Sequence, residues 1–469
     1  MQNTGLRSQV WNPTVVERLA HELARLAAKE LTRSGGPVRA PDCLPRIKAI
    51  LRREVKPGKI ASVVSEIADA SLHLCHPRFA AQQVAAPIPV AALVESVVAA
   101  LNNSLAVWEM SPAGTAIDRD LFDRFKRLFG YPARAEGTVV AGGGYANLTA
   151  LLAARAKLAP QAWNRGGARI AILAGAQTHY SVSRAAGILG LGCDAVFTIP
   201  LDSLYRTDAR EVPAAFRAAR RAGFRKFVLV ATCGSTPTGS CDDLRSFSRM
   251  ARREGAWLHV DAAHGGGFAF SRRHRHFLRG IERADSIAFD PHKMLFMPLA
   301  AGAVLVRDGR LLRNAFEQNA PYLFSGGKRE FPDIGPFTIA CSQRIDALKT
   351  WLTWKAYSNP LWDELTTGVC EVARAAYEFC ARSRVLEPMH EPQLNILCYR
   401  LRSRPRSGGA SDRLHWQIKE AVNASGRAYI SSTVLDGRRV FRIVVMNPRT
   451  TESDIVQVMR EVERAARQA

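Results

Sequence analysis

The sequence predicts an α/β protein: a large domain with a mostly parallel sheet, an N-terminal helical segment and a small C-terminal α+β domain. Short apolar runs, rich in leucine and β-branched residues, alternate with helical patterns between about residues 90 and 345. They lie at 168–175, 226–232, 256–263 and 302–308. Such runs are typical of buried parallel strands. Their alternation with helices favours a sheet covered by helices on both faces.

The first part of the chain is predicted to be helical. An apolar stripe at helical spacing indicates an amphipathic helix over 14–32, formed by Val15, Leu19, Leu23 and Leu26. The glycine- and proline-containing loop SGGPVRAPD ends it. A second helical segment is predicted over 36–75. We expect this N-terminal extension to pack on another surface, because its apolar stripe needs cover.

The last part of the chain changes pattern. Strands are predicted at 394–401 and 440–447, followed by a capped final helix that begins at the sequence TTESD. A chain of 469 residues usually forms more than one domain. We therefore predict an N-terminal helical segment over 1–75, a large α/β domain over 76–350 and a small α+β domain over 351–469.

Composition and charge argue against several classes of protein, namely nucleic-acid-binding, membrane-spanning and metal-binding proteins. The net charge is +23, but the arginines are spread along the chain without a basic tail. The densest basic run, at 271–279, is more typical of a solvated loop than of a nucleic-acid site. No run of 18 apolar residues occurs and nine cysteines are scattered singly. We predict no nucleic-acid partner, no membrane span, no metal site and, because the N-terminus lacks a secretion-signal layout, a cytoplasmic location.

Two stretches carry a lysine and a carboxylate that together suggest a cofactor. Lys293 lies in the apolar run FDPHKMLFMPLAAGA, where burial would lower the pKa of its amine and favour a Schiff base. Asp261 follows an apolar strand in HVDAAHGGG. An ionised carboxylate there needs a partner, and a protonated pyridine nitrogen would serve. A helix cap or turn explains Asp261 equally well when it is considered alone.

Two further stretches fit the same cofactor, pyridoxal 5′-phosphate (PLP). Three glycines in GGGYAN, at 142–147, run into a helix whose first N–H groups could bind a phosphate. A tight turn would explain these glycines as well. His179 lies between a predicted strand and helix and could stack on a planar ring, although an isolated histidine there is more often structural.

The four stretches resemble the group II PLP-dependent amino-acid decarboxylases of fold type I, the aspartate-aminotransferase-like fold. The resemblance is greatest to the glutamate and cysteine-sulfinate decarboxylases and covers roughly residues 70–465. Further motifs carry it, namely HPRF, THYS, ATCGST, DPHKM, APYLF, DALKTWLTWKA and FRIVVMNPRTT. It implies a PLP-dependent α-decarboxylase that releases CO₂ and an amine, and a homodimer whose active site lies at the subunit interface.

The resemblance also implies residue roles. Lys293, Asp261 and His179 would be catalytic: Lys293 would bind PLP and protonate the product, Asp261 would pair with the ring nitrogen, and His179 would stack on the ring. Substrate would contact Gln82, and Arg442 would hold its α-carboxylate. The predicted cofactor contacts are Gly143, Gly144, Tyr145, His179, Thr232, Asp261, Ala263, His292 and Lys293.

The sequence departs from the family pattern in three places. Tyr145 and Gly144 replace small or polar residues of the phosphate loop, and His264 stands where related enzymes have tryptophan or tyrosine. The lid stretch 325–341 lacks the tyrosine that protonates the product in several members and offers Phe331 and Phe337 instead. Gly326 and Gly327 are consistent with a flexible lid.

These departures leave the substrate open. An acidic amino acid (Glu, Asp or cysteine sulfinate) is the first expectation. 2,4-Diaminobutyrate or an aromatic or aliphatic amino acid is the alternative. A PLP carbon–carbon lyase, an oxidative deaminase on the same fold, and a non-enzymatic basic nucleic-acid-binding protein are the competing classes. The last would carry no lysine-bound PLP.

Overall fold

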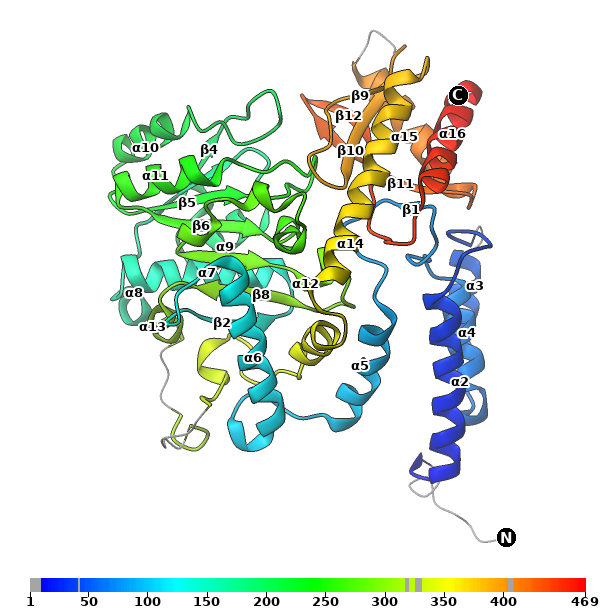
Figure 1. Cartoon of the computed structure of the whole chain (residues 1–469), viewed down its shortest axis with the longest axis horizontal. Coiled ribbons are helices and arrows are strands. Elements are labelled where there is room, and N and C mark those ends of the chain that lie inside the picture. The colour runs from blue at the N-terminus through cyan, green and yellow to red at the C-terminus, as the bar shows by residue number, and fades with distance from the viewer. Residues whose placement is uncertain (1–9, 41–42, 317–319, 325–330, 404–407) are drawn as a thin grey trace.

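The computed structural model describes residues 10–40, 43–316, 320–324, 331–403 and 408–469. Its largest element is a seven-stranded sheet in the order β2-β8-β7-β6-β5-β3-β4 (Figure 1). The four pairings among β7, β6, β5, β3 and β4 are parallel, while β8 is antiparallel to both of its neighbours. The strands are β2 (Glu136–Val140), β3 (Ala171–Gly175), β4 (Val196–Ile199), β5 (Phe227–Thr232), β6 (Trp257–Ala262), β7 (Ser286–Phe289) and β8 (Gly302–Val306).

Helices cover both faces of this sheet (Figure 1). The strands are buried on both sides, so successive residues of β5 face two different hydrophobic clusters: Leu229 packs with Phe216 and Phe247, and Val228 packs with Ala150. The helices of this part are α5 (Pro89–Leu101), α6 (Pro112–Phe129), α7 (Gly143–Leu158), α8 (Ala162–Arg165), α9 (Ser181–Ile188), α10 (Val212–Arg221), α11 (Leu244–Glu254), α12 (Pro291–Met294) and α13 (Gly309–Asn314). The predicted mostly parallel α/β fold is confirmed.

α14 (Ala347–Arg382), which is kinked at Ser358, leads to a second sheet in the order β1-β11-β12-β10-β9. All its pairings are antiparallel except β1–β11. The elements are β1 (Phe79–Ala80), β9 (Leu386–Pro388), β10 (Ile396–Leu401), α15 (Gly408–Ala424), β11 (Tyr429–Leu435), β12 (Arg438–Val444) and α16 (Glu452–Gln468). The predicted final helix is present, and Thr451 and Asp454 form its capping box. β1 precedes the large sheet in the chain but pairs within the small one, and the bounds of the three domains stay a prediction.

The N-terminal segment forms α2 (Pro13–Leu31), α3 (Cys43–Leu51) and α4 (Ile60–Asp69). These helices project beyond the small sheet along one side of the molecule (Figure 1). None of their residues is buried. Across the described ranges, no helix combines the length and the apolar character needed to cross a bilayer. In the same ranges, no group of three or more His, Cys, Asp or Glu side chains is placed to hold a metal ion.

Candidate active site

A cavity of about 300 Å³ lies at the carboxyl ends of the parallel strands. Parallel strands all end at the same edge of a sheet, which is where open α/β sheets bind ligands. β3, β5, β6 and β7 therefore bring together segments that are far apart in the chain. All nine predicted cofactor contacts line this cavity: Gly143, Gly144, Tyr145, His179, Thr232, Asp261, Ala263, His292 and Lys293.

Lys293 stands on the short helix α12, directly after β7. Its Nζ lies 3.0 Å from Oδ2 of Asp290, a carboxylate that is only 1% exposed. Nε2 of His292 lies 3.5 Å from the same oxygen, and burial is the main cause that lowers the pKa of His292. The resting lysine is thus held by a buried carboxylate at the wall of the cavity. Asp290 was not predicted as a site residue, although the motif DPHKM contains it.

Asp261, at the end of β6, is fixed by two hydrogen bonds. Asn147 Nδ2 donates to its Oδ2 at 2.9 Å, and the backbone N–H of Ala263 donates to its Oδ1 at 3.1 Å. Among the described residues, no lysine or arginine forms an ion pair with Asp261. A buried carboxylate whose hydrogen-bond donors are all neutral can still form an ion pair with a cation. This fits the protonated ring nitrogen of PLP, the group that the sequence leads us to expect here.

A chain of hydrogen bonds behind the cavity sets the orientation of Asn147. Ser286 Oγ accepts from Trp257 Nε1 and donates to His259 Nδ1, each at 2.9 Å. His259 Nε2 then donates to Asn147 Oδ1 at 2.9 Å, which leaves the amide nitrogen to face Asp261. Burial lowers the pKa of His259 to about 4, so its ring is neutral at pH 7. Sequence reasoning missed Asn147 and His259, although both lie in motifs that it had used.

The same amide also positions His179. Asn147 Nδ2 donates to Ser181 Oγ at 2.8 Å, and Ser181 Oγ donates to His179 Nδ1 at 2.8 Å. Because Nδ1 accepts, the proton of the neutral ring is on Nε2. Burial is the main cause that lowers the pKa of His179, which favours this neutral form. A neutral imidazole wall suits stacking on an aromatic ring.

The glycine loop between β2 and α7 allows close approach of backbone to the cavity. A Cβ on Gly143 would lie 2.8 Å from Asp290 Oδ2 and 3.1 Å from the Cβ of Ala263, so a side chain does not fit. Gly142 has φ 150°, and α7 begins at Gly143. The free N–H groups at the start of α7 are suited to a phosphate. Tyr145 is 53% exposed, so its side chain does little to close the cavity beside the start of α7.

The two predicted substrate contacts lie beside each other outside this lining. Arg442 Nη2 donates to Gln82 Oε1 at 3.1 Å, and its Nε donates to Ser431 Oγ at 3.0 Å. Its Nη1 donates to the carbonyl oxygen of Thr236 at 2.8 Å, and Thr236 lines the cavity. Arg442 is 6% exposed and, within the described residues, forms no ion pair with a carboxylate. A buried guanidinium with neutral partners and spare N–H donors is suited to bind an anion.

His264 also lines the cavity. Its Nε2 donates to Asn395 Oδ1 at 2.7 Å, since the amide of Asn395 donates to Val445. Burial lowers the pKa of His264 to about 3, so the ring is neutral and Nδ1 is an acceptor. That Nδ1 is buried and has no hydrogen-bond partner among the described residues.

The lid stretch is only partly described, and Gly326 and Gly327 lie outside the described residues. Phe331 stacks on Trp108 with ring centroids 5.5 Å apart. Phe337 is buried, and the guanidinium of Arg313 lies 4.6 Å from its ring centroid. Both phenylalanines thus have packing partners, and the sequence 325–341 offers no phenolic hydroxyl.

The strand order and the convergence of a lysine, a buried aspartate and a glycine-opened helix define a PLP-dependent enzyme of fold type I. The family model of the pyridoxal-dependent decarboxylase conserved domain matches residues 59–402. The chain belongs to this family; its cofactor is PLP, and it is a carboxy-lyase that acts on an amino acid.

Individual relatives agree in both sequence and structure. The chain is 30% identical to the cysteine sulfinic acid decarboxylase of Rattus norvegicus over 98% of each chain. It is 32% identical to the L-2,4-diaminobutyrate decarboxylase of Rhizobium meliloti, covering 87% of this chain and 82% of the relative. The crystal structure of mouse CSAD superposes with a TM-score of 0.91 at 26% identity, covering 97% of this chain and 99% of that one.

Proposed function

We propose that this enzyme decarboxylates a small acidic L-amino acid (glutamate, aspartate or cysteine sulfinate) and that the cavity residues divide the work as follows. Bound PLP supplies the electron sink that stabilises the electron pair left when CO₂ departs. Lys293 Nζ is the amine that binds the cofactor and returns a proton to the substrate carbon. Asp261 presents its negative charge to the ring nitrogen, and His179 lies against the ring.

The remaining contacts would hold the cofactor and the substrate. The phosphate would be received by the first N–H groups of α7, beside Gly143 and Gly144, with Thr232, Ala263, His292 and Tyr145 completing the lining. Arg442, oriented by Gln82, Ser431 and Thr236, would bind the substrate α-carboxylate. The observation that supports an amino-acid substrate held by its α-carboxylate is this buried guanidinium, which has no carboxylate partner in the described part of the chain; the acidic side chain rests on the relatives.

The names of two relatives support a substrate with an acidic side chain. Those named cysteine sulfinic acid decarboxylase and acidic amino acid decarboxylase GADL1 (Bos taurus, 29% identical) match 98% and 99% of this chain. The test is CO₂ release from a panel of the twenty standard amino acids, cysteine sulfinate and 2,4-diaminobutyrate. We expect the highest kcat/KM with an acidic substrate. If every acidic amino acid is inert while another substrate reacts, the acidic proposal is wrong.

A second candidate is 2,4-diaminobutyrate, and His264 favours it. His264 lines the cavity, and its buried, neutral Nδ1 has no partner among the described residues, so it would accept a hydrogen bond from a substrate ammonium group that reaches it. The same panel separates the two candidates. His264→Phe would then reduce kcat/KM for the diamino acid and leave that for an acidic substrate nearly unchanged.

We propose that the enzyme is a homodimer in which the N-terminal helices contact the second copy. Two exposed apolar stripes with helical spacing lie on neighbouring helices: Leu44, Ile47 and Leu51 on α3, and Ile60, Val64 and Ile67 on α4. Exposed apolar surface of this extent marks an interaction site. Light scattering during size-exclusion chromatography would give twice the chain mass of 51.5 kDa. A monomer at micromolar concentration would contradict the proposal.

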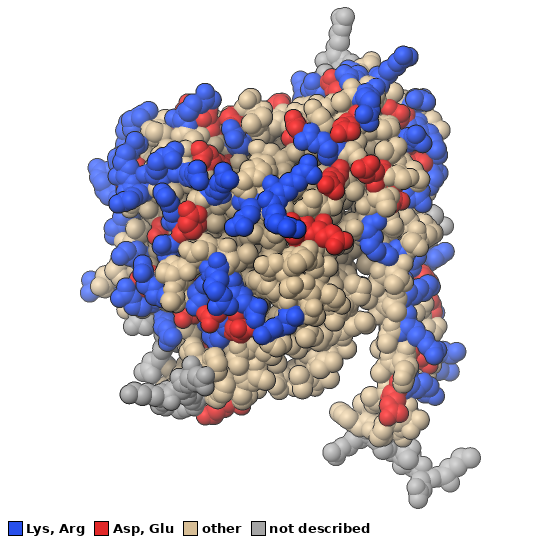
Figure 2. Space-filling model, viewed as in Figure 1, with Lys and Arg blue, Asp and Glu red and all other residues tan. Residues whose placement is uncertain are grey.

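The charge distribution fits this interface. Lys and Arg gather over α10 and α11, whereas a largely uncharged area covers the part of the same face where α5 lies (Figure 2). α5 exposes Leu93, Val97 and Leu101 there.

We also propose a cytoplasmic location, where thiols stay reduced, because every described cysteine is a free thiol. Cell fractionation tests it.

A further inference from the structure

Two cysteines that the proposed chemistry does not use face each other at the base of a loop beside the cavity. Cys233 follows β5 directly, and Cys241 returns next to it, with the loop 234–240 between them. Cys233 Sγ donates to Cys241 Sγ at 2.9 Å, and the two residues are 1% and 3% exposed. Nothing else in the described structure separates the two sulfur atoms. Across the part of the chain that the structure describes, no hydrogen bond joins any other two cysteines.

The backbone around the two cysteines has the geometry that a disulfide needs. The pair forms an antiparallel bridge in which Gly234 N–H donates to Ser240 O and Asp242 N–H donates to Thr232 O. Cys233 and Cys241 are therefore directly opposite at a non-hydrogen-bonded position. Cα atoms of such pairs are about 4.5 Å apart, within the range of about 4.4–6.8 Å found across disulfides. Linkage requires no rearrangement of the backbone.

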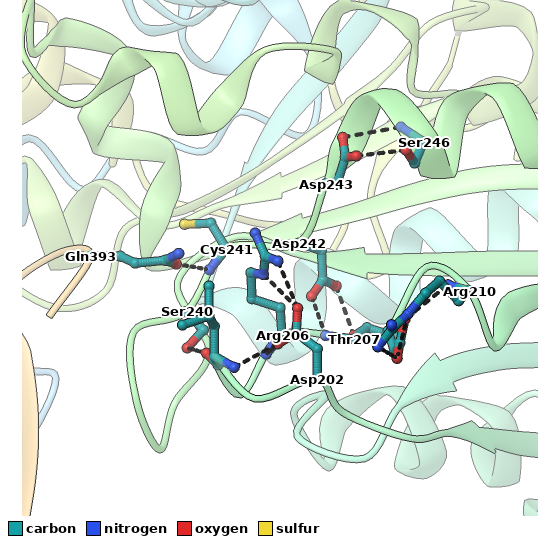
Figure 3. A network of polar contacts seen from close by, with 12 residues as sticks. Asp202, Arg206, Thr207, Arg210, Ser240, Cys241, Asp242, Asp243, Ser246 and Gln393 are labelled. Carbon is teal, nitrogen blue, oxygen red and sulfur yellow. Dashed lines mark hydrogen bonds and ion pairs between the residues drawn. The ribbon is translucent and has the colours of Figure 1, made fainter. Parts of the chain in front are cut away.

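Both ends of the loop are held by polar contacts. Asp242 accepts from the N–H groups of Thr232 at 2.8 Å and Thr207 at 2.7 Å, while Cys241 N–H donates to Gln393 Oε1 at 2.8 Å. Figure 3 shows Cys241 between Gln393 on one side and the Asp242 contacts on the other. The cysteines are thus fixed opposite each other by neighbours from the large sheet and from the segment before β10.

The loop reaches the part of the site where substrate is proposed to bind. Gly234 and Thr236 line the cavity, and the Thr236 carbonyl receives the hydrogen bond from Arg442. Cys398 Sγ donates to the Pro237 carbonyl at 3.1 Å. The loop therefore connects the large sheet to β10 and β12, and a covalent link at its base would restrict how far its carbonyls move.

We propose that Cys233 and Cys241 are a modification site: a dithiol that hydrogen peroxide converts reversibly into a disulfide, closing the loop 234–240. One thiolate attacks a peroxide oxygen, the O–O bond breaks and water leaves. The second thiol displaces hydroxyl from the sulfenic acid, the S–S bond forms and a second water leaves. Both sulfurs are oxidised, the peroxide oxygens are reduced, and both thiol protons end in water.

Peroxide is the oxidant because the site is enclosed. The cysteines are buried, and Gly234, which follows Cys233, lines the cavity, so a small neutral molecule can approach from there where a peptide disulfide cannot. The hydrogen bond to Cys241, together with burial, raises the pKa of the Cys233 thiol well above its usual range. The thiolate is the reactive form, so the bridge forms more slowly than oxidation of the exposed Cys193.

Peptide mapping gives a direct test that needs no substrate. Trypsin cleavage after Lys226 and Arg245 releases one peptide, 227–245, that holds both cysteines and no other. We expect holoenzyme treated with peroxide and then alkylated under denaturing conditions to give this peptide without alkyl groups and lighter by two hydrogen atoms. Dithiothreitol before alkylation restores two alkyl groups. Recovery of two alkyl groups without dithiothreitol, or of sulfinic acids on both cysteines, would overturn the proposal.

Variants and hydrogen exchange separate a specific bridge from general oxidation. Cys193→Ser leaves the bridged peptide unchanged, whereas Cys241→Ser abolishes it. In the wild-type protein, oxidation should slow amide hydrogen exchange in 234–240 by about 10-fold, because a cross-link restricts local opening. Unchanged exchange in a fully bridged sample would overturn the claim that the link closes the loop. These readouts stand whichever amino acid proves to be the substrate.

Discussion

The cavity at the sheet edge and the helices α2–α4 differ in whether their side chains find contacts within the same chain. At the cavity, Asp261, Asn147 and His179 are each held by hydrogen bonds from buried neighbours. On the N-terminal helices, the apolar side chains of α3 and α4 stay exposed. The first region is organised within one chain, whereas the second would be covered only in the proposed dimer. We therefore predict that the geometry of the cavity is set locally and that dimerisation depends on the exposed helices.

Among the variants that keep Lys293, the largest expected effect comes from removing the negative charge of Asp261. Asp261→Asn retains the shape but loses the negative charge that would face the ring nitrogen, so kcat should fall about 100- to 1,000-fold. Steady-state CO₂ release measures it. Asp243→Asn is the matched control, because Asp243 caps α11 away from the cavity and asparagine caps equally well. An Asp261 variant with wild-type kcat would remove this residue from the proposed chemistry.

The next effect tests the exposed region. Val64→Asp together with Ile67→Asp would place two charges in an apolar contact, and the dimer Kd should rise by at least about 100-fold. Analytical ultracentrifugation measures this Kd. Ser62→Asp on another face of α4 is the control and should leave it unchanged. Equal dimerisation of all three proteins would mean that α4 is not part of the interface.

Arg442→Lys keeps the positive charge at the proposed carboxylate-binding position but loses the planar set of guanidinium N–H donors. Hydrogen bonds from charged donors contribute about 1.5–3 kcal/mol, so KM should rise about 10- to 100-fold with a smaller change in kcat. Arg439→Lys, at a half-buried arginine of β12 that donates to Ser432 and does not line the cavity, is the control. If KM stays constant, the substrate carboxylate is bound elsewhere.

The smallest effect concerns stability rather than rate. Burial raises the pKa of Asp242 from 3.8 to about 6. The folded protein therefore keeps a proton that the unfolded chain releases, so this carboxyl makes the free energy of unfolding fall as pH rises from about 4 to 6. Asp242→Asn removes that part of the dependence, about 2 kcal/mol. Urea unfolding at pH 4.5 and 6.5 compares the two proteins, and parallel curves would contradict the assignment.

Sequence patterns predicted the large sheet well because its buried strands are continuous apolar runs, as in β5 and β6. They also led to nine residues that line the cavity, since each lies at or shortly after the end of a strand of the large sheet; their contacts with the cofactor stay a prediction. They missed Asn147, His259 and Asp290, because a residue that orients another is recognised only when its partner is known. The reversed direction of β8, its pairing with β2, and the pairing of β1 with β11 depend on contacts that no local pattern encodes.

The most direct test of the account is the absorption spectrum of the purified enzyme before and after borohydride. Lys293 bound to PLP predicts a band at about 410–430 nm that borohydride removes. Lys293→Ala should lack that lysine-linked band and retain less than about one ten-thousandth of kcat. Reduction followed by peptide mapping should then place the cofactor on Lys293. A wild-type protein with no such band after addition of PLP, or a cofactor found on another lysine, would contradict the account.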